Sequence, residues 1–416
     1  MWIMSEKSNM NRMDRSKLNI GTYYLAPYAG TEKHVKELAE CGIDMVVNMR
    51  YDMNTLDLFY KYHIGAIVTG ILPGWFGGDG SNAGTMSERN PLEAYKAASE
   101  VFRDHPAIWG IDTGDEPSGL DFTHYGRIFE HVREGFPNQF AYLNIYPSYG
   151  VKGSNTVQEI QAQLGTDTYA QYIERFCKEV DSNYICFDYY LYSANISGAY
   201  ETLCVVSDAC LRTGRSLWMV LQVNSNQPDK WITEKQLRFQ ANMALAFGAE
   251  VITWACYTAG WWYNHVLDKK GEKTEQYDKL KQVNSELHLL DKEYMKYRHV
   301  ATYFVGDFEE DELGAAGTTA VEVLNTNTFF EVKACGGQPL LVGQMLKRTD
   351  ASEEALMICA ADDPFDESPE AYQVTFRGHN KNARAFGRNG EVPLILKEDG
   401  SYAFTIHSCE GILLTV

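Results

Sequence analysis

Residues 109–118, Trp-Gly-Ile-Asp-Thr-Gly-Asp-Glu-Pro-Ser, place two adjacent acids, Asp115 and Glu116, directly after a short apolar run. The apolar residues predict a buried strand, and Gly114 and Pro117 predict its end. A carboxyl group that leaves a strand in this way is poorly solvated, and burial raises its pKa toward neutrality. A general acid needs such a pKa, so Glu116 is a candidate proton donor. For Asp115 the alternative role is to cap the helix that follows.

Short apolar runs alternate with longer helical patterns from Asn19 to about Arg298, which predicts repeated strand–helix units. The predicted strands are Ile20–Leu25, Asp44–Met49, Ala66–Leu72, Ile108–Asp112, Phe140–Ile145, Tyr184–Tyr190, Leu217–Val223 and Val251–Cys256. The predicted helices are Glu32–Glu40, Asn54–Lys61, Leu92–Asp104, Phe122–Glu134, Tyr169–Val180, Ala199–Thr213, Glu234–Phe247 and Thr274–Tyr294. Eight such units make a (β/α)8 or TIM barrel. An open doubly wound sheet is the alternative, but no Gly-x-Gly-x-x-Gly follows the first strand.

In a barrel the active site lies at the C-terminal ends of the strands and in the loops that follow them. Polar and aromatic side chains gather at these predicted ends, which favours a carbohydrate site because aromatic rings stack on sugars while amides and carboxylates bind hydroxyls. The candidate substrate-binding residues are Tyr24, Asn48, Asn144, Tyr189, Tyr190, Gln222, Asn224, Trp254 and Trp262, and Asp188 ends the sixth strand. For any single aromatic residue, packing is the alternative.

The loop after the third strand, residues 73–84, is rich in glycine and contains Trp75, a further candidate for substrate binding. It lacks the Gly-Lys-Ser/Thr ending of a phosphate-binding loop. We expect a rim over the carbohydrate site, and an ordinary surface loop is the alternative.

After Arg298 the pattern changes to short β-rich runs separated by turn signals, which predicts an antiparallel β-sandwich. These runs are Ala301–Val305, Thr319–Asn325, Phe329–Cys335, Leu340–Leu346, Ala355–Ala360, Tyr372–Phe376, Val392–Leu396, Ser401–Ile406 and Gly411–Val416. The acidic stretch Asp307–Glu312 is typical of a solvated loop. We therefore expect a flexible segment over residues 1–18, a catalytic barrel over 19–298 and a β-sandwich over 299–416.

The chain carries 37 Lys and Arg against 56 Asp and Glu, a formal charge of −19. It has no basic patch, so nucleic acid is not an expected partner, and no apolar run of about eighteen residues that could span a membrane. The nine cysteines are scattered, with no Cys-x-x-Cys pair, which favours buried thiols and a reducing, cytoplasmic compartment. A signal peptide removed beforehand and a homo-oligomer both stay open.

The ten histidines lie mostly in predicted helices and loops rather than at strand ends. A metal-dependent hydrolase would need a histidine cluster at those ends. We therefore expect neither a metal nor a cofactor.

The segment His105–Pro117 resembles the fourth-strand acid/base segment of barrel-type glycoside hydrolases, most of all clan A and its β-galactosidase-like members. Phe187–Tyr190 and Thr253–Thr258 are similar to sixth-strand and eighth-strand segments of these proteins, and Asp399–Ile406 with Glu410–Leu414 resembles their C-terminal sandwich. The resemblance implies a glycosidase whose acid/base is the glutamate of the Asp-Glu-Pro segment.

The sequence departs from that family at two points. Asp115 stands where clan A has an asparagine, and Leu217–Ser225 contains no carboxylate where the resemblance implies a nucleophilic glutamate. Gln222 or Asn224 occupies that place. The second carboxylate of a glycosidase lies about 5–5.5 Å from the acid in retaining enzymes and about 6.5–9.5 Å in inverting ones. Asp188 is the best remaining candidate.

Three hypotheses follow. The first is a glycoside hydrolase with Glu116 as general acid/base, assisted by Asp188 or Asp115. The second is a substrate-assisted hexosaminidase in which Asp115 orients a 2-acetamido group that Tyr189 or Tyr190 helps to hold. The third is a barrel that binds carbohydrate without turnover. Strict strand alternation would place Asp112 on the side of Glu116, as a partner that raises the pKa of that acid.

Overall fold

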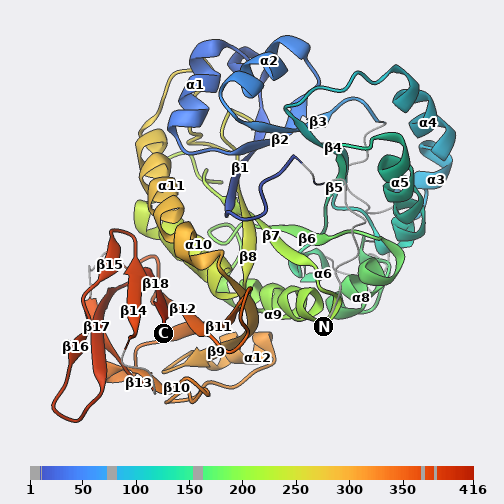
Figure 1. The fold of residues 1–416 in the computed structure, drawn as a ribbon. Helices are drawn as coiled ribbons and strands as arrows, with labels where there is room; N and C mark the ends of the chain where they lie inside the picture. The colour runs from blue at the N-terminus through green and yellow to red at the C-terminus, as the bar shows by residue number, and fades with distance from the viewer. Residues whose placement is uncertain (1–9, 11, 73–81, 153–162, 367–370, 379–381) are drawn as a thin grey trace.

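The computed structural model describes residues 10, 12–72, 82–152, 163–366, 371–378 and 382–416. Eight parallel strands form a barrel in the order β5-β4-β3-β2-β1-β8-β7-β6 (Figure 1). A parallel bridge between Ile145 and Phe187, with the Ile145 N–H donating to the Cys186 carbonyl at 2.9 Å, joins β5 to β6. The strands are β1 (Asn19–Leu25), β2 (Met45–Arg50), β3 (Gly65–Thr69), β4 (Ile108–Asp115), β5 (Phe140–Asn144), β6 (Tyr184–Tyr189), β7 (Ser216–Gln222) and β8 (Ala249–Ala255).

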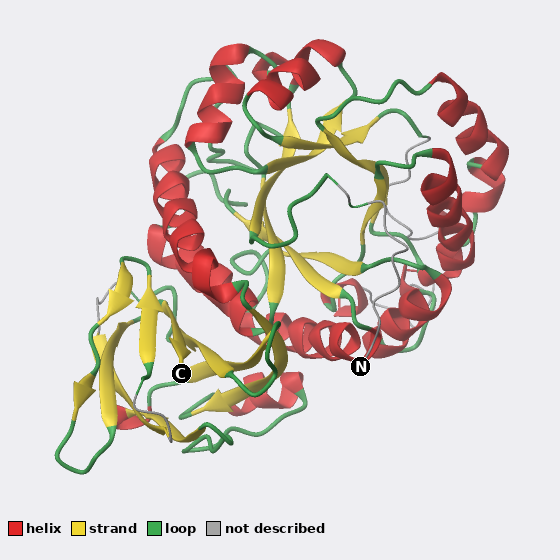
Figure 2. Ribbon diagram, in the orientation of Figure 1, coloured by secondary structure: helices red, strands yellow, loops and turns green. Residues whose placement is uncertain are grey.

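Helices surround the barrel on its outside (Figure 2). They are α1 (Glu32–Glu40), α2 (Met53–Lys61), α3 (Met86–Arg89), α4 (Leu92–Val101), α5 (Phe122–Gly135), α6 (Tyr149–Lys152), α8 (Tyr169–Glu179), α9 (Ile196–Thr213), α10 (Glu234–Ala246) and α11 (Glu275–Tyr294). The predicted barrel is confirmed, since each predicted strand and helix overlaps an observed one. Thr168, Asn195 and Thr233 each cap the next helix by accepting a backbone N–H.

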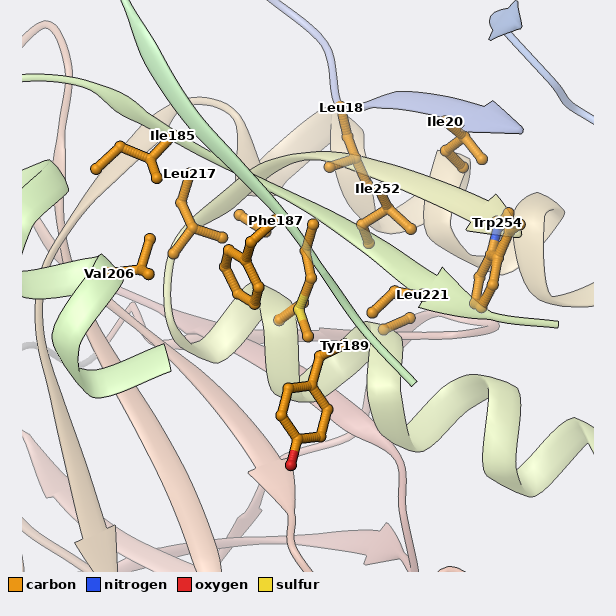
Figure 3. Packing of buried hydrophobic residues seen from close by; sticks show 14 of the residues in the cluster. Leu18, Ile20, Ile185, Phe187, Tyr189, Val206, Leu217, Leu221, Ile252 and Trp254 are labelled. Carbon is orange, nitrogen blue, oxygen red and sulfur yellow. The ribbon is translucent and has the colours of Figure 1, made fainter. Parts of the chain in front are cut away.

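Alternating side chains divide the barrel into two apolar layers. On β6, Tyr184 and Cys186 pack inside the barrel, whereas Ile185, Phe187 and Tyr189 pack outward against the helices (Figure 3). Successive residues of a strand face opposite sides, so Asp188 faces the interior.

The described part of the N-terminal segment is packed against the barrel. Met10 and Met13 join the cluster inside the barrel. The Arg12 guanidinium donates to Asp104 at 2.8 Å and to the carbonyls of His105 and Ile108 at 2.6 and 3.0 Å. These contacts tie the segment to the residues that lead into β4.

The C-terminal residues form two antiparallel sheets around a core of their own, which confirms the predicted sandwich. One sheet has the order β10-β13-β17-β16 and the other β15-β14-β18-β12-β11-β9. The strands are β9 (Tyr297–Val305), β10 (Phe329–Ala334), β11 (Leu340–Lys347), β12 (Glu354–Ala360), β13 (Ala371–Gly378), β14 (Arg384–Gly387), β15 (Gly390–Val392), β16 (Ile395–Leu396), β17 (Tyr402–His407) and β18 (Gly411–Thr415).

Two details of this region differ from the prediction. The acidic stretch leads into a short helix, α12 (Glu310–Ala316), because Glu309 and Glu312 form a capping box and Gly317 ends the helix in the left-handed conformation. The strand predicted at Thr319–Asn325 is wrong, because Val321 and Leu324 make isolated bridges only.

The sandwich packs on α10. Gly343 of β11 approaches the helix so closely that a Cβ there would lie 2.2 Å from the Ala246 carbonyl oxygen, and the Thr302 hydroxyl donates to the same oxygen at 3.0 Å. Only a residue without a side chain fits at position 343.

We expect Gly343→Ala to lower the free energy of unfolding by about 1–3 kcal/mol, because the added methyl group collides with the backbone of α10. Gly314→Ala is the matched control, since a Cβ there meets nothing within 4 Å. Urea unfolding of both variants measures the effect. Equal stabilities would show that this contact does not constrain the interface.

Candidate active site

The acidic segment lies at the C-terminal end of β4, which runs to Asp115 rather than ending at Asp112 as predicted. Its register with β5 shifts between Asp112 and Asp115, and Gly114 there has φ 147°. Ile111 packs in the outer layer, so Asp112 faces inward, and the bulge turns Asp115 inward as well. The expected strict alternation is therefore interrupted at this point.

Asn144, the last residue of β5, contacts all three candidate acids. Its side-chain amide donates to Asp115 Oδ1 at 2.9 Å and to Asp188 Oδ1 at 2.7 Å, and its backbone carbonyl accepts the Glu116 N–H at 2.9 Å. An amide has two hydrogens, and both are used here. In this structure Asn144 therefore fixes the acids relative to one another.

Asp188 is the centre of the cluster. It is 3% exposed, and the Tyr149 hydroxyl donates to its Oδ2 at 2.8 Å. Burial raises its pKa, and hydrogen bonds with Asn144, Tyr149 and Glu116 partly offset that rise. Glu116 is half-buried and takes the left-handed conformation, with φ 45°. That conformation is costly for a residue with a side chain and is often found at functional sites.

Two other carboxyl groups titrate near neutrality. Burial and the charge of Asp188 raise the pKa of Asp115 to about 7. Burial also raises the pKa of Asp112 to about 7, against hydrogen bonds from the Gly114 N–H and Thr69. Like charges this close resist joint ionisation, so the cluster holds protons at neutral pH. It can present a protonated carboxyl beside an ionised one.

Aromatic rings from β1, from the residue that follows β6 and from the loop after β8 lie near these acids. The Tyr23 hydroxyl donates to Asp115 Oδ2 at 3.5 Å, and its ring contacts Trp261 with centroids 5.8 Å apart. Tyr190 makes an edge contact with Trp262 at 4.9 Å. Burial raises the pKa of Tyr23 well above its usual range, and the charge of Asp115 raises it further. A hydrogen bond with Asn48 partly offsets this rise.

The structure therefore brings several predicted residues together near the acids: Asn48, Asn144, Tyr190 and Trp262. Tyr24 is half-buried and packs on the same interior cluster. Trp75 lies outside the described residues.

Four other predicted residues make contacts within the protein. The Trp254 indole donates to Asn284 of α11, and the Tyr189 hydroxyl donates to the Asn195 carbonyl, so both face the outer layer. The Gln222 amide binds Ser193 and the backbone of Tyr192 and Asn224. The Asn224 amide bonds to the backbone of Trp261 and Cys256. Their hydrogen-bonding groups hold loops in place.

The capping alternative for Asp115 does not match the structure, because the Ser118 side chain caps the next turn by accepting the Leu120 N–H. Sequence reasoning missed Tyr149. It belongs to a short helix after β5 within Tyr-Pro-Ser-Tyr-Gly, and no spacing in that stretch indicates contact with the sixth strand. The one feature of the sequence that could have indicated Tyr149 is that a tyrosine follows β5, the strand between the two acid-bearing strands.

No protein-family model matches the sequence, and no curated protein matches it significantly. Solved structures do match. A cycloisomaltooligosaccharide glucanotransferase from Paenibacillus sp. has a TM-score of 0.54 and 7% identity, over 97% of this chain and 85% of that one. A rhamnosyl-glucuronidase from Fusarium oxysporum 12S (TM-score 0.46, 10% identity, 97% and 96%) and a glycoside hydrolase family 5 mannosidase from Rhizomucor miehei (0.43, 11%, 66% and 94%) are also similar. The resemblance to barrel-type glycoside hydrolases is confirmed for the fold.

Among the described residues, no helix combines the length and apolar character needed to cross a membrane. Nor do their His, Cys, Asp and Glu side chains form a group of three or more arranged to hold a metal ion.

The raised pKa of Asp112 predicts a pH-dependent stability. Between about pH 4 and pH 7 the folded protein keeps a proton on Asp112 that the unfolded chain has lost, so stability falls as pH rises through this window. Asp112→Asn removes this loss. We expect the variant to gain about 1–3 kcal/mol at pH 8 relative to pH 4, measured by urea unfolding.

Asp208→Asn is the matched control, because it removes the same charge from an exposed position on α9. Its effect should be small at either pH. A gain for Asp112→Asn that is the same at pH 4 and pH 8 would contradict the buried-carboxyl interpretation.

Proposed function

We propose that the protein is a glycoside hydrolase. The observation that carries this proposal is the position of Asn144, whose side-chain amide holds Asp115 and Asp188 together while its backbone carbonyl fixes the backbone of Glu116. Cleavage of a glycosidic bond needs a proton donor and a second carboxylate on either side of the anomeric carbon. A cluster of acids that holds protons at neutral pH beside an ionised carboxylate supplies both.

In this mechanism Glu116 donates the proton to the leaving oxygen, and Asp188 acts on the anomeric carbon. Glu116 begins the loop after β4, whereas Asp188 is anchored on β6 by two donors. Asp115, with its pKa raised to about 7, stabilises the proton on its neighbour or returns it after each turnover.

The closeness of the two acids favours retention of configuration. A hydrogen bond joins Glu116 to Asp188, so they lie nearer to the spacing of a retaining pair than to that of an inverting pair, which must leave room for water. In the retaining scheme Asp188 attacks the anomeric carbon and forms a glycosyl ester. Water then hydrolyses the ester with Glu116 as base.

The substrate is proposed to be a carbohydrate because two aromatic pairs lie close to the acids. The half-buried rings of Tyr190, Trp261 and Trp262 offer surfaces for the apolar faces of sugars, and the buried ring of Tyr23 packs behind Trp261.

The substrate-assisted mechanism is the second candidate. It is favoured by the inward turn of Asp115 beside Glu116, which would let Asp115 orient a 2-acetamido group. Tyr190 is then the tyrosine available to assist, since Tyr189 bonds to Asn195. Hydrolysis restricted to 2-acetamido sugars would distinguish this mechanism from the first.

We expect Glu116→Gln to lower kcat on a responsive nitrophenyl glycoside by about 100- to 10,000-fold while sugar binding persists, because only proton transfer is lost. Asp188→Asn should be similarly impaired. Glu100→Gln, an exposed change on α4, is the matched control and should keep full activity. A nitrophenyl glycoside panel with NMR of the product anomer provides both measurements.

Full activity of Glu116→Gln would refute the proposed acid. Sugar binding without turnover by the wild-type protein on every glycoside would instead support the third hypothesis, a carbohydrate-binding barrel. The absence of a carboxylate from β7 is the feature that favours this third hypothesis.

A further inference from the structure

Asp188 and Asp115 differ in the donors that reach them. Each has one oxygen bound by the Asn144 amide, at 2.7 Å for Asp188 and 2.9 Å for Asp115. The second oxygen of Asp188 accepts the Tyr149 hydroxyl at 2.8 Å, whereas that of Asp115 has a longer contact, 3.5 Å, with Tyr23. The shorter donor contacts therefore favour a charge on Asp188.

Tyr149 is held in place to act as a donor. It begins α6, it is half-buried, and its ring packs on Tyr189 with centroids 5.4 Å apart. Burial and the nearby charge of Asp188 raise its pKa further above the usual range. The hydroxyl consequently stays protonated and donates without adding charge to the cluster.

The groups around Asp188 come from several elements. Those that interact with it are Tyr23 of β1, Asp115 of β4, Glu116, Tyr149 of α6, Tyr169 of α8, Cys186 of β6, and Tyr190 directly after β6. All of these are acids, so their ionisation would oppose a charge on Asp188. Hydrogen-bond donation is what favours that charge.

We propose that Tyr149 is a positioning residue that makes Asp188 the ionised member of the acid cluster and leaves the proton on Asp115 and Glu116. The inference rests on the proposed function, in which Glu116 gives a proton and Asp188 acts as the carboxylate. It adds a reason why two neighbouring buried acids take different roles. The unequal donor contacts make Asp188 and Asp115 differ in charge before any substrate binds.

Carboxyl ¹³C NMR of protein labelled at aspartate tests this directly. Asp188 and Asp115 are assigned by the signals lost in Asp188→Asn and Asp115→Asn. In the wild type we expect the Asp188 signal to titrate at lower pH than the Asp115 signal. In Tyr149→Phe the Asp188 midpoint should rise by about one to two pH units, because a hydrogen bond to the charged form is lost.

Tyr294→Phe is the matched control. Its hydroxyl is buried and donates to the carbonyls of Leu245 and Ala249, outside the acid cluster. This variant should lose stability without moving either titration. An unchanged Asp188 midpoint in Tyr149→Phe would overturn the inference. If that variant does not fold, titration of Asp188 above Asp115 in the wild type would overturn it instead.

Kinetics separate this inference from the proposed function. With a glycoside that the wild type hydrolyses, Tyr149→Phe should move the acidic limb of the kcat profile to higher pH while KM changes little. If Tyr149→Phe turns the glycoside over and the acidic limb of its kcat profile has not moved, the role of Tyr149 is overturned but the proposed hydrolase is not. Lack of turnover by the wild type would overturn the proposed hydrolase and leave the NMR result to decide the role of Tyr149.

Discussion

The candidate site depends on the two N–H donors of the Asn144 side chain. Three carboxyl groups packed at one end of a barrel repel one another when ionised, and burial makes each charge still more costly. The Asn144 side-chain amide reduces both the repulsion and the cost of burial, because each of its hydrogens is donated to one carboxyl oxygen. The backbone carbonyl of Asn144 adds the third link by accepting the Glu116 N–H. The rest of the fold keeps this amide in register.

That register comes from the closure of the barrel between β5 and β6. The parallel bridge between Ile145 and Phe187 sets the end of β5 beside Asp188, so Asn144 reaches the sixth strand. On the other side, the shifted register between β4 and β5 turns Asp115 toward the same amide. Close contact among the acids thus follows from three neighbouring strands, spaced about 4.8 Å apart.

Much of the fold could be predicted from the sequence, because apolar periodicity and turn residues act locally. The barrel strands were recognisable from runs such as Phe140–Ile145, and β4 was missed only beyond Asp112. The site was less predictable. Whether Trp254 faces sugar or helix depends on which side of the strand it occupies, and its bond to Asn284 puts it outside. The contact of Tyr149 with Asp188 joins positions 39 residues apart, which no local pattern encodes.

β7 carries no carboxylate, and in this arrangement Asp188 of β6 is the acid that bonds to Glu116 in its place. An acid on β7 would lie three strands from β4, one strand further than an acid on β6. Asp188 instead lies two strands from Asp115 and accepts from the same amide, and a hydrogen bond joins it to Glu116. In the proposed hydrolase, a sugar that enters between Glu116 and Asp188 must replace their hydrogen bond with its own contacts. Glu116 is the member suited to move, since it leaves the strand in a left-handed turn, whereas Asp188 is held on β6 by Asn144 and Tyr149.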